Sequence, residues 1–303
     1  MRSLALAFDV GGTSVRGAVV GAADVVMAES RVPTRTGPAV LDDIARMGEE
    51  LLAGLSPTAR ADVAGVGVAF PGLVDTEAGI SRRAVNLGLA DTLVAAPLAE
   101  RLGLPVTVVH DTVAAAAAIW ADAGSPASAF VAVLGTGVAG VTYVGGRAVL
   151  GVSGQAGEIG HLVVDRAGPR CRCGLRGCVE AYAGGRAMLE RYASMVGDVT
   201  ISGVADLVAR AGRDHFAAQI WSDAITALAD GFLAVGALLA PGEIILGGGV
   251  AEAGRELLDP LRTRMSERAG VTAVPPVRVS TLGGRAGLIG AARLALEAVR
   301  TNP

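Results

Sequence analysis

The feature that most constrains this chain is a unit of strand, glycine turn and strand that occurs twice. The first copy, LALAFDVGGTSVRGAVV, predicts β-strands at 4–10 and 14–20, followed by a third strand near 25–30. A second copy, FVAVLGTGVAGVTYVGG, begins at Phe130 with the same order of elements. Few side chains match between the copies, so the repeat indicates shared architecture, a chain built from two similar domains.

The segments around these units alternate between helical and strand patterns. Apolar residues from Pro38 to Leu55 recur at helical spacing, and the runs VAGVGVAF and VTVVH (106–110) predict buried strands, the second followed by an alanine-rich helix. Strands EIIL and VRVST come later, and a last helix at about 287–300 is expected to pack on the first domain. The pattern predicts an α/β protein with a smaller domain, 1–112 plus 287–303, and a larger one, 113–286, with a glycine- and cysteine-rich insert at 151–185.

The composition limits the class of partner. With 303 residues and 51% hydrophobic content the chain can bury a large core, and a net charge of −3 with scattered basic residues offers no electrostatic surface for nucleic acid or an anionic membrane. The sequence contains no lysine, which excludes the P-loop and protein-kinase plans, because both place a lysine on the phosphates. The expected partner is a small molecule.

Two further features bear on localisation. The apolar segment from Trp221 to Ala240 contains Asp223 and Asp230 and lacks basic anchors at its ends, so it is predicted to be a core helix rather than a membrane span. Three cysteines and no signal peptide argue against a disulfide framework. These features predict a cytoplasmic protein.

The strongest local signal is a cluster of metal-ligand residues. All three cysteines, Cys171, Cys173 and Cys178, lie close together, and His161 precedes them. Three thiolates and one imidazole form a tetrahedral zinc set with no open position, which is typical of structural rather than catalytic zinc. The alternative is three reduced thiols without a metal.

Both glycine turns are candidates for phosphate binding, because small residues let backbone amides approach a phosphate. The candidate residues are Gly11, Gly12, Thr13, Thr136 and Gly137. Asp9, at the end of the first strand, would face Mg²⁺ through water. Each turn alone is compatible with a simple hairpin, but the pair predicts a phosphate clamp to which both domains contribute.

Asp111 is the candidate general base. It follows the strand that ends at His110 and opens the alanine-rich helix. A helix N-terminus keeps a carboxylate ionised, so that Asp111 can accept a hydroxyl proton during phosphoryl transfer. The alternative is a simple N-cap, and both roles are compatible with the same geometry.

Carboxylates near the metal cluster are candidates for hydroxyl recognition. The segment GVSGQAGEIGH places Glu158 and His161 three residues apart among glycines, and Glu180 lies two residues after the last cysteine. Carboxylates accept hydrogen bonds from vicinal hydroxyls, and a bound zinc would hold Glu180 at the same end of the domain. The alternative for each glutamate is a solvated loop residue.

Taken together, these residues resemble the ROK family (repressors, open reading frames and kinases), with the closest likeness to its bacterial glucokinases, from Asp9 to about Ala292. The resemblance implies a two-domain actin-like, hexokinase-like (ribonuclease H-like) fold and an ATP-dependent hexose kinase with Mg²⁺, structural zinc and a dimeric or tetrameric assembly. It further implies adenosine contacts around Gly247, Gly248 and Gly249. The implied sugar-binding residues are Gly72, Asn86, His110, Asp111, Glu158, His161 and Glu180.

Two positions depart from the family pattern. The family usually has asparagine before the base, where this chain has His110. Because that asparagine holds hydroxyls on the far side of the sugar ring in the family, the change favours a sugar altered near C3 or C4, such as 3-amino-3-deoxyglucose (kanosamine), over plain glucose. The alternative is that His110 turns away from the ligand and glucose remains the best substrate. The second turn reads GTGVAG, with Ala139 where a further glycine is common.

Three alternative functions remain open. N-acetylmannosamine or N-acetylglucosamine kinases share the motifs described above. A ROK repressor would need a helix-turn-helix before the kinase-like body, yet the first strand begins within four residues of Met1. A non-catalytic sugar-binding protein is disfavoured because Asp111 and both phosphate turns are present.

Overall fold

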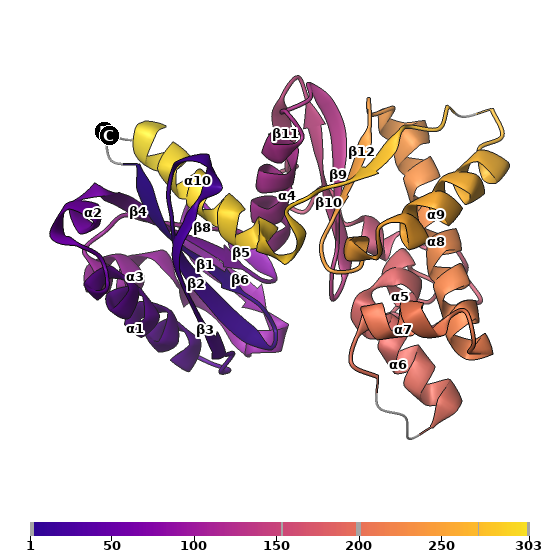
Figure 1. Cartoon of the computed structure of the whole chain (residues 1–303), viewed down its shortest axis with the longest axis horizontal. Coiled ribbons are helices and arrows are strands. Elements are labelled where there is room, and N and C mark those ends of the chain that lie inside the picture. Colours follow the sequence, from indigo (N-terminus) through magenta and orange to yellow (C-terminus); the bar gives the residue numbers. More distant parts are fainter. Residues whose placement is uncertain (1–2, 153, 198–200, 272, 302–303) are drawn as a thin grey trace. The chain divides into compact units, whose positions relative to one another are not determined.

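The computed structural model describes residues 3–152, 154–197, 201–271 and 273–301. The chain folds into two compact units (Figure 1): Met1–Ala118 with Arg285–Pro303, and Ile119–Gly284. The first boundary between the units falls within helix α4, and the second just before helix α10. The domain limits expected from the sequence, 112/113 and 286/287, stay predictions.

The first unit is built on a five-stranded sheet in the order β3-β2-β1-β4-β8. A smaller three-stranded sheet, β5-β6-β7, is formed by the segment between β4 and β8. Its elements are β1 (Leu4–Val10), β2 (Ser14–Val20), β3 (Val26–Pro33), α1 (Ala39–Ala53), α2 (Pro57–Asp62), β4 (Val63–Phe70), β5 (Leu73–Asp75), β6 (Ile80–Ala84), β7 (Leu89–Leu93), α3 (Ala95–Leu102), β8 (Val106–His110), the first part of α4 (Asp111–Asp122) and α10 (Ala286–Thr301). Strands β1, β2 and β3 are antiparallel, whereas β4 and β8 run parallel to β1. The carboxyl ends of β1, β4 and β8 therefore lie at one edge of the sheet.

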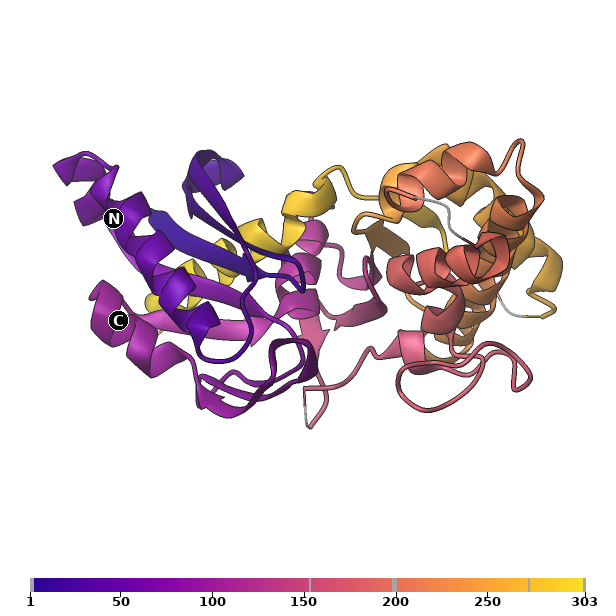
Figure 2. The same ribbon diagram turned by 90° about the horizontal axis from the view of Figure 1, so that it is seen from below.

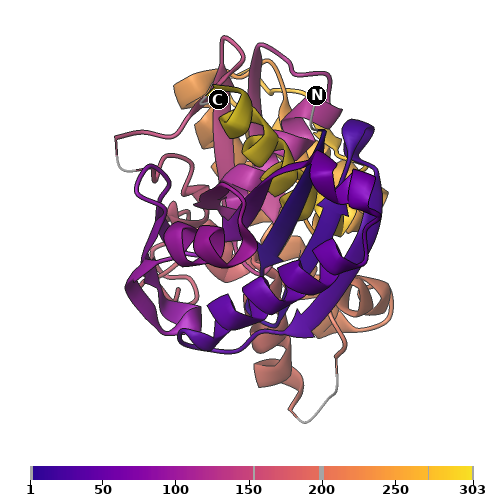
Figure 3. The same ribbon diagram turned by 90° about the vertical axis from the view of Figure 1, so that its left-hand side faces the viewer.

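Helices cover both faces of this sheet (Figures 1 and 3). On one face, Val40, Ile44 and Met47 of α1 pack on alternate strand residues, including Leu6 and Phe8, because successive strand side chains point to opposite faces. The other face is lined with small residues and is covered by α10, through Leu288, Ala291, Ala292 and Ala295. The predicted packing of the last helix on the first domain is confirmed.

The approach of α10 is close enough to require glycine at two positions. A Cβ at Gly67 of β4 would lie 1.9 Å from the carbonyl oxygen of Ala291, and one at Gly290 would lie 1.7 Å from that of Ala114. Real Cβ atoms do not approach the backbone this closely. Only glycine at these two positions therefore permits α10 to pack this closely on the sheet and on α4.

The second unit repeats this plan with the sheet order β11-β10-β9-β12-β13. Its elements are the last part of α4, β9 (Ser128–Leu134), β10 (Val138–Val144), β11 (Arg147–Val149), α5 (Val179–Ala183), α6 (Gly185–Val196), α7 (Val204–Arg210), α8 (His215–Leu239), β12 (Ile244–Gly247), α9 (Arg255–Arg268) and β13 (Val277–Val279). Again three antiparallel strands are followed by two parallel ones. The duplication predicted from the two glycine hairpins is thus confirmed at the level of topology.

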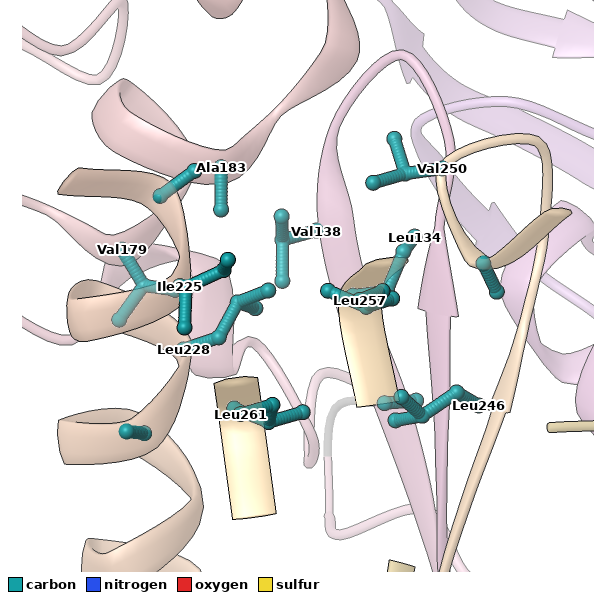
Figure 4. Packing of buried hydrophobic residues seen from close by; sticks show 14 of the residues in the cluster. Leu134, Val138, Val179, Ala183, Ile225, Leu228, Leu246, Val250, Leu257 and Leu261 are labelled. Atoms are coloured by element: carbon teal, nitrogen blue, oxygen red, sulfur yellow. The ribbon is translucent and has the colours of Figure 1, made fainter. Parts of the chain in front are cut away.

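Helices α5 to α9 gather over one face of the second sheet (Figure 2). There Leu134, Val138 and Leu246 meet Leu228 of α8 and Leu261 of α9 in a single buried cluster (Figure 4). Burying a side chain of this size stabilises the fold by about 1.5–3 kcal/mol. The cluster therefore anchors the hairpin β9–β10, whose turn carries candidate site residues.

Helix α8 is long and apolar enough, by length and composition, to pass as a membrane span, yet 50% of its most apolar stretch is buried inside the unit. It begins at His215, six residues before the predicted segment, because the Asp214 side chain caps it by accepting from the amides of Phe216 (2.9 Å) and Ala217 (3.2 Å). Ile220, Leu228 and Phe232 lie in the core, so α8 is the core helix that was predicted.

Candidate functional site

The turn of the first hairpin leaves two backbone amides available for hydrogen bonding. The amide of Gly11 donates to the Ser14 carbonyl at 3.0 Å and closes the turn, and the Thr34 hydroxyl donates to the Gly11 carbonyl at 2.6 Å. Within the described part of the chain, no acceptor is recorded for the amides of Gly12 and Thr13. Both residues are exposed, so their N–H groups are available to a phosphate oxygen.

Asp9 precedes this turn and pairs with Arg16, whose Nη2 donates to Oδ2 at 2.6 Å. Burial raises the pKa of the Asp9 carboxyl, Arg16 opposes the shift, and the negative charge of Asp111 adds to it. Oδ1 of Asp9 has no recorded partner among the residues that the structure describes. This oxygen can accept from the water shell of a hydrated Mg²⁺, which retains several waters in nucleotide sites.

The candidate sugar residues of the first unit lie at the ends of strands β4, β6 and β8. Gly72, just after β4, has φ +86°, and a Cβ there would lie 2.2 Å from the Arg83 carbonyl oxygen, so glycine is required. Asn86 is exposed in a short 3₁₀ turn. His110 pairs with Phe70 in the sheet register, at the carboxyl edge where Asp9 also lies.

Asp111 opens α4 without capping it in the usual way. Its Oδ1 accepts from the amide (2.6 Å) and the hydroxyl (3.3 Å) of Thr112, the next residue, whereas an N-cap side chain accepts from the second or third amide of the helix. His110 Nε2 lies 3.4 Å from the same oxygen. For Oδ2 no hydrogen-bond partner is recorded in the described ranges. One carboxylate oxygen is therefore free to accept a proton at a helix N-terminus.

In the second unit the two candidate nucleotide turns lie side by side. Gly248 has φ +88°, and a Cβ there would lie 2.4 Å from the carbonyl oxygen of Leu134, the residue that ends β9. The Val250 amide also donates to Leu134, at 2.9 Å. The structure therefore brings Gly247, Gly248 and Gly249 next to the turn that contains Thr136 and Gly137. No acceptor for the amides of Thr136 and Gly137 is recorded among the described residues.

A glycine-rich loop carries Glu158 and His161 against strand β10. A Cβ at Gly157 would lie 1.8 Å from the Gly140 carbonyl oxygen, and one at Gly160 would lie 2.0 Å from that of Val138. The Gly140 amide donates to the Gly157 carbonyl at 2.9 Å. The close approach holds the His161 Nε2 atom 3.9 Å from Oε2 of Glu158.

The other ring nitrogen of His161, Nδ1, lies near the cysteines. This nitrogen lies 3.7 Å from Sγ of Cys171, the Sγ atoms of Cys173 and Cys178 are also 3.7 Å apart, and the four ligand atoms lie within 4.8 Å of one another. A tetrahedral site with Zn–S bonds of ~2.3 Å separates its sulfurs by about 3.8 Å. The cluster thus fits a structural zinc ion, with His161 able to ligate through Nδ1 while Nε2 faces Glu158.

Without metal, the thiols differ in acidity. Burial raises the pKa of Cys178 to about 12 and also raises that of Cys171. Burial opposes ionisation of Cys173 as well, but hydrogen bonds from the Leu175 amide and the neighbouring thiols leave its pKa lowered. Since zinc binds thiolates, its binding to this cluster displaces protons from buried sulfurs.

Several contacting residues were missed by sequence reasoning. Arg16 pairs with Asp9 in the antiparallel β1–β2 register. Aligning the two predicted strands across their turn would have identified it. Gly287, the second residue of α10, has its Cβ position 3.0 Å from the Asp9 carboxyl group, and Thr112 donates to Asp111. The Gly287 contact depends on tertiary packing and leaves no local signal.

Comparison with known proteins covers nearly the whole chain. Residues 5–298 match the sequence profile of the ROK family. A glucokinase of Halalkalibacterium halodurans is 32% identical over 303 aligned positions, which cover 93% of this chain and 92% of the relative. A kanosamine kinase of Amycolatopsis mediterranei is 31% identical over 306 positions, with 96% and 95% covered.

Among solved structures, a ROK family glucokinase from Streptomyces griseus in complex with glucose and AMPPNP superposes with a TM-score of 0.84 at 28% identity, covering 97% of this chain and 99% of that one. The similarity agrees with the actin-like, hexokinase-like fold expected from the sequence.

Proposed function

The chain belongs to the ROK family and is an ATP-dependent sugar kinase, and we propose that it phosphorylates the 6-hydroxyl of glucose or of a glucose-like amino sugar such as 3-amino-3-deoxyglucose, with Asp111 as general base. The observation that carries the proposal is the Asp111 carboxylate, which opens α4 and is engaged through Oδ1 by Thr112. The sugar kinases among its relatives support the substrate class.

Asp111 accepts the proton of the sugar hydroxyl as that oxygen bonds to the γ-phosphorus and ADP leaves. The helix N-terminus favours the ionised carboxylate, and Thr112 fixes its rotamer, so the base is oriented before the sugar arrives. General-base catalysis of this kind contributes about 10²–10⁴ in rate.

The remaining candidate residues divide between the two ligands. In this proposal the sugar is bound by Gly72, Asn86, His110, Asp111, Glu158, His161 and Glu180. Backbone amides at Gly11, Gly12, Thr13, Thr136 and Gly137 bind phosphate, and Gly247 to Gly249 contact adenosine. Asp9 would hold the water shell of a Mg²⁺ ion bound with the nucleotide, and that ion would supply charge neutralisation at the phosphates.

The proposal is tested by ATP consumption in a coupled assay with glucose, 3-amino-3-deoxyglucose, N-acetylmannosamine and N-acetylglucosamine. We expect the highest kcat/KM for one of the first two sugars. A preference for an N-acetylated sugar would contradict the substrate assignment, and the absence of turnover with all four would contradict the kinase assignment itself.

His110 is expected to set the preference among these sugars. An imidazole beside the base changes both the space and the hydrogen bonds near C3 and C4 compared with asparagine, and buried polar groups left unpaired penalise the wrong sugar. We expect His110→Asn to shift the ratio of kcat/KM values towards glucose over 3-amino-3-deoxyglucose by at least about tenfold, which is roughly 1.4 kcal/mol.

The ratio separates this role from an effect on the base. Because His110 Nε2 lies 3.4 Å from Asp111, the variant can also lower kcat for both sugars equally. A parallel loss with an unchanged ratio would show that His110 acts on Asp111 and not on specificity, leaving the kinase assignment intact.

The proposal also includes a cytoplasmic location and a homodimeric or homotetrameric assembly. The three free thiols, which a reducing compartment preserves, and the packing of α8 into a protein core support the location. The assembly is proposed from the family resemblance.

A further inference from the structure

Glu180 contacts the phosphate turn of its own unit directly. Its Oε2 accepts from the amide of Val138 at 3.0 Å, across 42 positions of sequence. A Cβ on Gly137 would lie only 2.3 Å from that oxygen, so the turn needs glycine at this position to admit the carboxylate. The half-buried side chain thus rests on the residue whose amide is expected to bind phosphate.

The backbone around Glu180 is fixed to the same turn. Helix α5 is anchored by Val179 and Ala183, which share a buried cluster with Val138 (Figure 4). Where α6 begins, the Gly185 amide donates to the Gly135 carbonyl at 2.9 Å, and the Arg186 amide donates to the Thr136 carbonyl at 3.3 Å. The carboxylate is therefore held at the turn by a rigid support and not by its own rotamer alone.

The two oxygens of Glu180 face different surroundings. Oε2 lies 2.3 Å from the Cβ position of Gly137, whereas Oε1 lies 3.9 Å from it. In the described residues no hydrogen-bond partner is recorded for Oε1. One oxygen is thus committed to the phosphate turn while the other is available to a hydroxyl group.

We propose that Glu180 couples sugar binding to nucleotide binding, with Oε2 fixed on the phosphate turn and Oε1 accepting a sugar hydroxyl. The inference rests on the proposed function and adds an energetic link between its two ligands. A bare carboxylate beside Thr136 and Gly137 disfavours a phosphate through like charge. A hydroxyl donated to Oε1 offsets part of that charge, so the bound sugar raises the affinity for ATP, and by reciprocity ATP raises the affinity for the sugar.

The coupling factor is measured as the ratio of dissociation constants of AMPPNP without and with the best sugar of the panel, by titration calorimetry. We expect a factor of about five or more for the wild type, within the usual range of coupling between sites. Glu180→Gln keeps one carbonyl oxygen for the Val138 amide but removes the charge. We expect it to bind AMPPNP at least as tightly as the wild type without sugar, and its coupling factor to fall below about two.

Glu158→Gln is the matched control. Glu158 is also assigned to the sugar, but the contact recorded for its side chain is with His161, not with the turn. We expect this variant to weaken sugar binding while the coupling factor stays at the wild-type value. A structural role for Glu180 would instead lower the melting temperature and leave the coupling factor unchanged.

Two results would overturn the inference while leaving the kinase assignment in place. One is a wild-type coupling factor close to one in an enzyme that turns over the sugar. The other is a Glu180→Gln variant with raised KM for the sugar and undiminished coupling, which would make Glu180 a sugar ligand alone. Failure of the proposed function has a different signature, the lack of turnover with every sugar of the panel.

Discussion

Asp111→Asn is expected to lower kcat by roughly two to four orders of magnitude, the range assigned to general-base catalysis. The amide cannot accept the hydroxyl proton, but it is nearly isosteric and can still accept from the Thr112 amide through its carbonyl oxygen. Sugar binding and the melting temperature should therefore change little. The measurement is steady-state turnover at saturating sugar and Mg-ATP, together with a thermal melt.

Asp214 offers the matched control, because it is a helix-capping aspartate. Its carboxylate accepts from two amides of α8 and from the Tyr192 hydroxyl, whereas the hydrogen bonds that the described residues donate to Asp111 come from Thr112. Replacing an N-cap costs about 1 kcal/mol of stability, and the loss of the acceptor for the buried Tyr192 hydroxyl adds to that cost. Asp214→Ala should therefore lower the melting temperature and leave kcat nearly unchanged. Asp111→Asn would count against the base assignment if it kept more than about a tenth of the wild-type turnover.

The sequence predicts most of the fold because its signals are local. Alternating apolar residues around glycine turns specify both hairpins, and the helical spacing of Val40, Ile44 and Met47 marks the face that α1 buries. Element ends are less accurate. The start of α8 was placed too late, since the cap at Asp214 precedes the apolar run that identifies the helix.

In the candidate site too, some residues can be identified from local sequence, whereas their contacts depend on tertiary structure. Ligand chemistry alone identifies Cys171, Cys173 and Cys178 with His161, since few other functions require that set, and the structure brings their ligand atoms together. The hydrogen bond from Val138 to Glu180 joins residues 42 positions apart and depends on how α5 packs on the hairpin. Such contacts arise from tertiary structure, so the sequence can nominate Glu180 but cannot show what it touches. The roles of the sugar- and nucleotide-site residues stay predictions.

The second large effect is expected at the metal cluster. One zinc ion per chain should be found by elemental analysis, and Cys173→Ser should lose it, because serine is a poor ligand for zinc. At free zinc about a thousand times Kd, binding stabilises the folded state by about 4 kcal/mol. For a unit of this size, 1 kcal/mol corresponds to about 2–4 °C, so the variant should melt about 8–16 °C lower. KM for the sugar should rise as well, since the metal holds His161 next to Glu158.

Arg172→Ser is the control for that substitution, since it changes the residue between the first two cysteines without touching a ligand. The Arg172 ion pair with Glu190 is solvent-exposed on both sides, and pairs of this kind contribute little to stability. We therefore expect normal zinc content, melting and kinetics in Arg172→Ser, and a strong chelator should make the wild type behave like Cys173→Ser. If chelated, metal-free protein melts and turns over like the untreated enzyme, the cluster is three reduced thiols and a histidine, and the support proposed for Glu158 through His161 disappears with the zinc.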